Sequence, residues 1–120
     1  MQAISLAEAQ TAKADQLTQY RAEIDVMASE IVGELNNKIA EQPFVGDWRA
    51  TRGADSTNNL IVKYAMQKAA LAFGESGEFS PTVHAKYDGY AGDPRTRYTF
   101  EIAVMPKEGL KIPEVLAAPR

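Results

Sequence analysis

The fold is decided by residues 5–42, SLAEAQTAKADQLTQYRAEIDVMASEIVGELNNKIAEQ, which contain no proline and a single glycine, Gly33. Ser5 and Glu8 have the spacing of a capping box, in which the two side chains satisfy free N–H groups of a first helical turn. From Leu17 onward, apolar residues recur three and four positions apart, which is the helical period. Pro43 ends the pattern because the residue before a proline is forced out of the α region. The sequence therefore predicts one long amphipathic helix over residues 5–42.

The apolar stripe of this helix consists of five residues: Leu17, Tyr20, Ile24, Met27 and Ile31. It is typical of a helix side that packs on a sheet. It is also compatible with the seam of a coiled-coil homodimer, although a seam normally extends over three to four heptads and only two are clean here. A helix of about 37 residues is roughly 55 Å long, more than a small sheet covers. We therefore expect the Ala- and Gln-rich turns before Leu17 to extend beyond the body, where a partner or a second subunit would bind.

After Pro43, β-branched and aromatic residues alternate between clusters of turn residues, which is typical of strands. Residues 44–52, 79–87 and 98–105 are predicted strands, and residues 53–58 a turn. Residues 59–73 are ambiguous, because Leu60, Val62 and Tyr64 alternate as in a strand whereas residues 66–72 favour a helix capped by Gly74. We choose a long strand, since the compact turn at residues 74–77 leads directly into another alternating run.

The predicted fold class is α+β, with a long N-terminal helix packed on a four-stranded antiparallel meander sheet. The alternative is two helices with a three-stranded sheet. Residues 1–120 form a single domain, divided into a long helix (5–42), an antiparallel sheet (43–105) and an extended tail (106–120). Pro81 cannot donate to a ladder, so its strand is predicted at an edge or begins after the proline.

Composition limits the possible functions. The chain has 45% hydrophobic and 24% charged residues, as in an average soluble globular protein, and it has no cysteine. Residues 1–42 carry three basic against seven acidic residues, which argues against a general DNA-binding protein or an anionic membrane surface as partner. No apolar stretch approaches the roughly 18–20 residues that span a bilayer, and the N-terminus does not resemble a signal peptide. A cytoplasmic location is expected.

Catalytic patterns are missing from the sequence. His84 is the only histidine, and it stands near no nucleophile motif. One histidine without cysteine makes a zinc site improbable, and residues 88–93 lack the alternating ligands of a calcium loop. No glycine-rich phosphate motif is present. We therefore expect no cofactor, no metal ion and no enzymatic activity.

Basic and aromatic residues are concentrated in the predicted strands and the loops between them. The candidate binding residues are Trp48, Arg49, Arg52, His84, Lys86, Tyr87, Tyr90, Arg95 and Arg97. Trp, Tyr and Arg often anchor protein interfaces, whereas aromatic rings beside Arg and Lys can also hold single-stranded nucleic acid. The predicted function is a small non-enzymatic interaction module, such as an inhibitor, an adaptor or an assembly factor, acting through its sheet face and loops. Such an accessory protein could form a homodimer through the N-terminal helix, and the alternative is a nucleic-acid-binding module.

Overall fold

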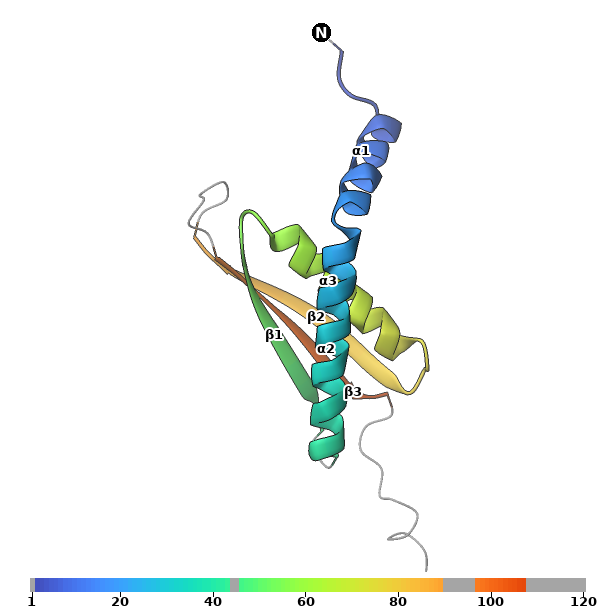
Figure 1. The fold of residues 1–120 in the computed structure, drawn as a ribbon, viewed down its shortest axis with the longest axis vertical. Helices are drawn as coiled ribbons and strands as arrows, with labels where there is room; N and C mark the ends of the chain where they lie inside the picture. Colours follow the sequence, from blue (N-terminus) through green and yellow to red (C-terminus); the bar gives the residue numbers. More distant parts are fainter. Residues whose placement is uncertain (1, 44–45, 90–96, 108–120) are drawn as a thin grey trace, which may run out of the picture.

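The computed structural model describes residues 2–43, 46–89 and 97–107 of the chain. The described residues form three helices and one three-stranded sheet (Figure 1). In chain order the elements are α1 (Leu6–Gln19), α2 (Arg21–Glu41), β1 (Trp48–Asp55), α3 (Asn59–Gly74), β2 (Phe79–Asp88) and β3 (Arg97–Pro106). The fold class is therefore α+β with an antiparallel sheet, and the alternative with three strands is closer to it than the four-stranded prediction.

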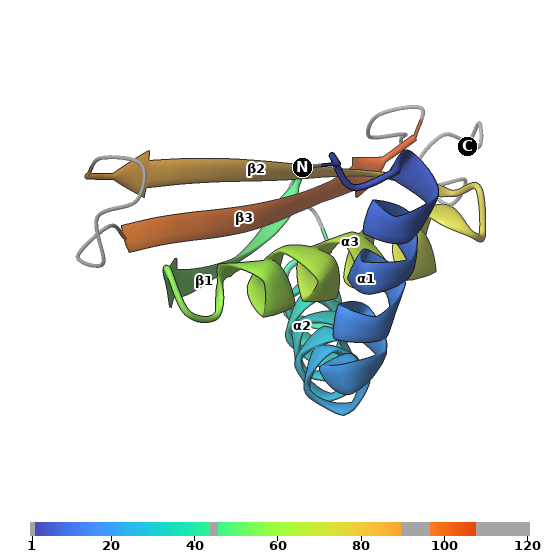
Figure 2. The same cartoon turned by 90° about the horizontal axis from the view of Figure 1, so that it is seen from above.

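The sheet has β3 at its centre, between β1 and β2. β3 runs antiparallel to both neighbours, so β1 and β2 run in the same direction and α3 connects them. The predicted meander is wrong in this respect, because a meander places consecutive strands side by side. Helices α2 and α3 lie on one side of the sheet (Figure 2). Among the described residues nothing covers the other side.

The N-terminal helix is not continuous, which corrects the prediction of a single helix over residues 5–42. It is divided at Tyr20, whose φ of −101° and ψ of 6° are not helical. Thr18 lies just before this joint and donates its hydroxyl to the carbonyl oxygen of Ala14 at 2.9 Å. Threonine back-bonding of this kind bends helices. The bend is compatible with packing of both Leu17 and Tyr20 against the core.

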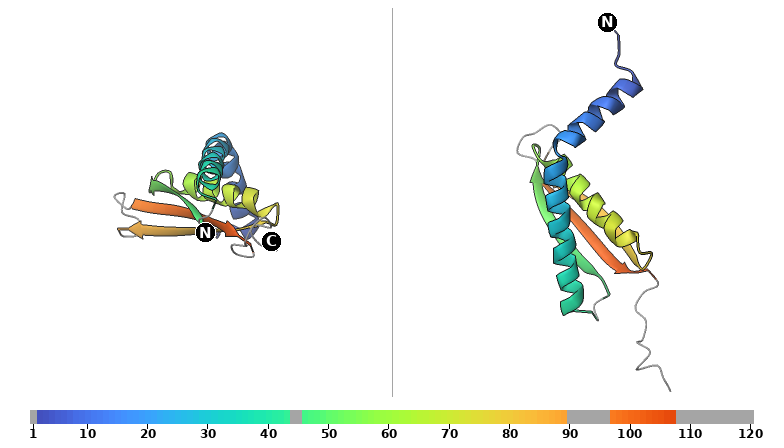
Figure 3. Two further views of the ribbon diagram at one scale, coloured as in Figure 1. Left: turned by 90° about the horizontal axis from the view of Figure 1, so that it is seen from below. Right: turned by 45° about the vertical axis from the view of Figure 1, so that its right-hand side comes forward.

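Helix α1 projects from the body along the long axis of the molecule (Figure 1; Figure 3, right). None of its fourteen residues is buried. The predicted cap is present, since the Glu8 N–H donates to the Ser5 hydroxyl oxygen at 3.1 Å. In the middle of α1, Lys13 Nζ lies 5.8 Å from the centre of the Tyr64 ring. The Ala- and Gln-rich turns therefore extend beyond the body, as expected.

Residues 59–74 form a helix, so the strand predicted over residues 59–73 is wrong. Its buried residues are Ile61, Val62, Ala65, Met66, Ala69 and Phe73, which follow the helical period. A strand would have pointed successive residues of this run to opposite faces, and only one face of this sheet is covered. The Ala-rich second half also favours a helix by propensity. The turn that follows was predicted correctly, and Gly77 adopts a φ of +73° that favours glycine.

The other strands agree with their predictions apart from their ends. β2 and β3 match the predicted runs to within one residue, and β2 lies at an edge of the sheet, as Pro81 indicated. β1 continues to Asp55, so the predicted turn begins later. There the Asp55 carboxylate accepts hydrogen bonds from the N–H groups of Thr57 and Asn58, at 2.8 and 3.3 Å. Residues 44 and 45, and the predicted tail from residue 108 onward, lie outside the described residues.

The core lies between the two helices and the sheet. Its largest fully buried side chains are Ile31, Leu35, Met66, Ile102, Val62 and Val104. Helix α2 contributes Ile24, Ala28, Ile31 and Leu35. An ion pair between Asp25 and Lys68 joins α2 to α3 at the surface, and the Lys68 hydrogen bond lowers the pKa of Asp25. The face of the sheet beneath α2 and α3 is therefore largely filled by core side chains.

Candidate functional site

The apolar stripe predicted on the N-terminal helix is part of the core. Ile24 and Ile31 are buried, and Leu17, Tyr20 and Met27 pack against the core while remaining partly exposed. The stripe therefore faces the sheet and α3 of its own chain. The stripe thus packs within its own chain, and the turns of α1 before Leu17 contribute no buried residue to the body.

The uncovered face of the sheet carries four of the predicted binding residues. Alternation along the strands places Arg49, His84, Lys86 and Arg97 on this face. In the ladder, Asp88 and Asp55 are the register partners of Arg97, and Glu101 is the partner of His84. Acidic and basic residues thus alternate across this face.

Arg49 is engaged by acidic neighbours on both sides. Its Nε lies 2.7 Å from an oxygen of Asp47, and its Nη1 lies 2.7 Å from an oxygen of Glu101. The hydrogen bond that Arg49 donates to the Asp47 carboxylate is the main reason why the pKa of Arg49 is raised, and the bond to Glu101 adds to it. A phosphate would have to displace these carboxylates to reach the guanidinium group.

The remaining predicted residues do not join this face. Trp48 is buried on the helix side, where its Nε1 donates to the Gln42 carbonyl oxygen at 3.0 Å. Arg52 also lies on the helix side, and its Nη1 lies 3.0 Å from a carboxylate oxygen of Glu34. Tyr87 alternates to the helix side as well, although it is 61% exposed. Tyr90 and Arg95 lie outside the described residues. The predicted cluster is therefore divided between the two faces of the sheet.

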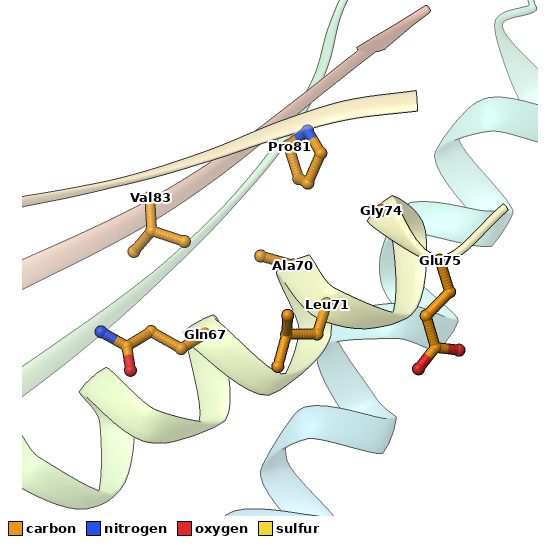
Figure 4. Close-up of a pocket in the computed structure, with 7 residues that line it drawn as sticks. All are labelled: Gln67, Ala70, Leu71, Gly74, Glu75, Pro81 and Val83. Atoms are coloured by element: carbon orange, nitrogen blue, oxygen red, sulfur yellow. The ribbon is translucent and has the colours of Figure 1, made fainter. Parts of the chain in front are cut away.

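A groove runs between α3 and the edge strand β2 (Figure 4). Its volume is about 650 Å³. It is lined by Gln67, Ala70, Leu71, Gly74, Glu75, Pro81 and Val83. Four of these side chains are purely apolar, and the two polar ones, Gln67 and Glu75, stand toward opposite ends of the α3 wall. We call this hollow the α3–β2 groove.

Leu71 is a highly exposed apolar residue of the groove, with 68% of its surface accessible. It also borders a second hollow of about 420 Å³, which α3 shares with the joint between α1 and α2. A leucine so exposed on a helix that buries most of its apolar residues is a departure from the amphipathic pattern. The sequence analysis does not find the groove because it predicts a strand over residues 59–73, where the structure has α3. The helical period of these residues, with Leu71 outside it, was the signal that would have found it.

Strand β2 borders the groove with its free edge. In the described part of the chain, β2 pairs only with β3. An edge strand presents backbone N–H and C=O groups that have no partner in the sheet. Pro81 removes one donor, so the edge available for pairing begins at Thr82 and continues to Asp88. An apolar hollow therefore lies directly beside a row of free backbone groups.

The structure gives no sign of a metal centre or of a membrane span in the ranges that it describes. Acidic and histidine side chains within 2–43, 46–89 and 97–107 form no group that could hold a metal ion. None of the helices in these ranges has both the length and the apolar character needed to cross a bilayer. The chain matches no protein-family model, and comparisons with curated proteins and with solved structures give no significant match.

Proposed function

We propose that the chain is a small non-enzymatic protein-interaction module that binds an extended segment of a partner in the α3–β2 groove. The observation that carries this proposal is the exposed Leu71 in an apolar groove beside the free edge of β2. This groove combines apolar walls with a sheet edge, whereas the second hollow that Leu71 borders is lined by helix residues. The sequence predicted an interaction module acting through the sheet face and loops, and the groove moves the proposed surface to the sheet edge.

The proposed binding mode is strand addition. An extended peptide pairs its backbone with an edge strand, and pockets beside the edge select alternate side chains. Residues 82–88 of β2 would supply the backbone groups. Leu71 and Val83 would receive one apolar side chain between them, since they stand on the two walls of the groove.

The chemistry of the groove defines the partner segment. Apolar residues at alternate positions would face Ala70, Leu71 and Val83, and polar residues between them would face solvent. Glu75 at the Gly74 end favours a lysine or arginine on the segment there, because opposite charges attract across a partly desolvated surface. The partner is thus an extended, alternating segment with one basic flank.

Titration of the isotope-labelled full chain with such a peptide, followed by NMR, tests the proposal. The probe is a peptide of alternating valine and threonine with one terminal lysine. We expect shift changes confined to residues 67–75 and 79–88. A matched control peptide, N-methylated at alternate positions, cannot donate the backbone hydrogen bonds and should bind at least tenfold more weakly. Shift changes centred on Arg49, Thr51 and His84 would instead assign binding to the open sheet face and reject the groove.

Homodimerisation through the N-terminal helix stays a prediction, and we propose that it is restricted to α1. An isolated helix of about fourteen residues is marginal in water, and α1 buries none of its residues in its own chain. Sedimentation of the full chain over a hundredfold range of concentration measures this directly. A mass that stays that of one chain throughout would reject the homodimer.

Nucleic-acid binding remains the alternative prediction, with less support. Stacking of bases needs aromatic rings beside the cations, whereas Trp48 and Tyr87 lie on the opposite side from Arg49 and Lys86. We expect the chain to pass through a single-stranded oligonucleotide column unretained at about 0.15 M salt, where phosphate contacts are already weakened. Retention that falls steeply as salt rises would favour the alternative.

A further inference from the structure

We propose that Lys86 selects an acidic residue on the added strand, which is the partner segment once it is paired with β2. The partner segment would then carry an aspartate or glutamate on the face that it turns away from the groove. This inference rests on the proposed function, because it names the chemistry of the partner at the same sheet edge. Three observations support it: the direction of the backbone groups of β2, the closure of the other sheet edge, and the charges beside Lys86.

The backbone groups that β2 leaves free belong to alternate residues. Lys107 donates its N–H to the carbonyl oxygen of Glu78 at 2.9 Å, so residues 78 and 107 form a hydrogen-bonded pair. Such pairs alternate with non-hydrogen-bonded pairs along an antiparallel ladder. The even-numbered residues of β2 therefore bond to β3, and the odd-numbered residues point their backbone groups outward. Beyond Pro81, the outward donors are the N–H groups of Val83, Ala85 and Tyr87.

The opposite edge of the sheet is closed by cationic side chains. In β1 the same alternation points the backbone groups of the odd-numbered residues outward. Lys38 donates its ammonium group to the outward carbonyl oxygen of Arg49. Arg52 donates to the outward carbonyl oxygen of Thr51 at 2.7 Å. In the described part of the chain, side chains thus occupy two outward carbonyl groups of β1 and no outward group of β2, which favours β2 for strand addition.

Lys86 is exposed on the open face of β2 and has no opposite charge beside it in the sheet. Its register partner in β3 is Thr99. Its neighbours on the same face, His84 and Asp88, are paired with an acidic and a basic residue of β3. Among the described residues, the Lys86 ammonium group forms no ion pair. The position on its other side belongs to the added strand, and a carboxylate there would complete the charge pattern.

The ladder geometry brings a side chain of the added strand close to Lys86. We take the added strand to run antiparallel to β2, because parallel pairing is slightly less stable per residue. The backbone of Lys86 bonds to β3, so Lys86 forms a non-hydrogen-bonded pair with the added strand, with α-carbons about 4.5 Å apart. Opposite charges facing each other across strands stabilise the pairing. The partner segment therefore combines apolar residues toward the groove with an acidic residue on the open face.

Isothermal titration of the full chain with matched peptides tests this selection. The reference is the valine–threonine peptide as a heptapeptide with valine first and lysine last, whose second residue faces Lys86 when the first faces Tyr87. The acidic peptide has glutamate in place of the second residue. The control peptide has glutamate in place of the sixth residue instead, so its composition and net charge are the same. We expect the acidic peptide to bind about threefold more tightly than the control peptide, which is the scale of a cross-strand ion pair.

Reversing the charge at position 86 gives a sharper test. Lys86→Glu should reverse the preference, so that the control peptide binds about threefold more tightly than the acidic one. A third peptide with lysine as its second residue should then bind more tightly than either. Lys86→Gln should abolish the preference without introducing a repulsive charge. Lys13→Glu makes the same change of net charge on α1, and this matched variant should keep the original preference.

Two outcomes would overturn selection by Lys86. In the first, the acidic and control peptides bind the unsubstituted chain equally while both shift the NMR signals of residues 67–75 and 79–88, so the groove stands and only the selection is wrong. In the second, Lys86→Gln strengthens both peptides equally, as expected of a lysine that only deters strands from pairing with an edge. If no peptide shifts these residues, the proposed function is overturned and the inference with it.

Discussion

Gly33 lies within α2 although nothing in the described structure requires a glycine there. A β-carbon at this position would have no described heavy atom within 4 Å, apart from its own helix backbone. Glycine in a helix interior costs about 1 kcal/mol relative to alanine. We expect Gly33→Ala to raise the free energy of unfolding by about 0.5–1 kcal/mol in urea denaturation. A lower stability would show that α2 needs close approach at this point.

Glu34 links α2 to β1 by accepting from two cations. Its carboxylate oxygens lie 3.2 Å from Lys38 Nζ and 3.0 Å from Arg52 Nη1. Burial alone would raise the pKa of Glu34, but the hydrogen bonds from Lys38 and Arg52 hold it below its usual value of 4.5. A folded-state pKa below the unfolded one stabilises the fold above the unfolded pKa, and this stability is lost as pH falls through the folded pKa.

Glu34→Gln removes this pH-dependent stabilisation. We expect the substitution to lower the free energy of unfolding by about 0.5 kcal/mol at pH 7, the scale of partly exposed ion pairs. The difference from the unsubstituted chain should disappear below the folded pKa, where both side chains are neutral. Urea titrations at a series of pH values falling from 7 measure it, and a difference that persists once Glu34 is protonated would assign the effect to packing instead.

At the residue scale, the sequence shows which residues of a strand share a face, but it does not show which face the helices cover. The sequence predicts that Trp48, Arg49 and Arg52 lie in one strand. The predicted binding cluster nevertheless includes all three, although residues of one strand alternate between two faces. Alternation alone separates Trp48 from Arg49. Which of these two residues is covered depends on where α2 lies. The ion pair of Arg49 with Glu101 also depends on the register between β1 and β3, which the sequence does not specify.

At the element scale, the apolar stripe of α2 packs into the core of its own chain. Ile31 is fully buried, whereas Val26 on the same helix is 60% exposed. Truncating a buried isoleucine to alanine typically costs 2–5 kcal/mol. We expect Ile31→Ala to lower the free energy of unfolding by about 3 kcal/mol, and Val26→Ala by less than about 0.5 kcal/mol. If Ile31→Ala instead altered the oligomeric state at unchanged stability, the stripe would be a seam between chains.

Two elements were not predictable from local pattern alone. Residues 59–73 fit a strand in their first half and a helix in their second half, and burial on one side of the sheet decides for the helix. The joint at Tyr20 has no proline or glycine to mark it, and only the adjacent Thr18 is a local cause of bending. By contrast, β2 and β3 were identified correctly because their alternation is clear and their ends carry turn residues.

At the scale of the whole molecule, the strand order of the sheet depends on residues 59–74 being a helix, α3. A four-stranded meander needs a strand between β1 and β2, and turning that segment into a helix makes β1 and β2 run in the same direction. β3 then fills the position between them. This order leaves β2 at an edge with α3 beside it, and the groove exists only because of both. A sequence analysis that assigned a strand to residues 59–73 could therefore not locate the groove.

The most direct test of the groove is the binding of the valine–threonine peptide to two leucine variants, measured by isothermal titration. Leu71→Asp places a charge in the groove, whereas Leu60→Asp places the same charge on the same helix away from it. Burying an unpaired carboxylate opposes binding. We predict that Leu71→Asp weakens the peptide at least tenfold while Leu60→Asp changes its dissociation constant by less than twofold. Equal effects of the two substitutions, or none, would contradict the assignment of the α3–β2 groove as the binding site.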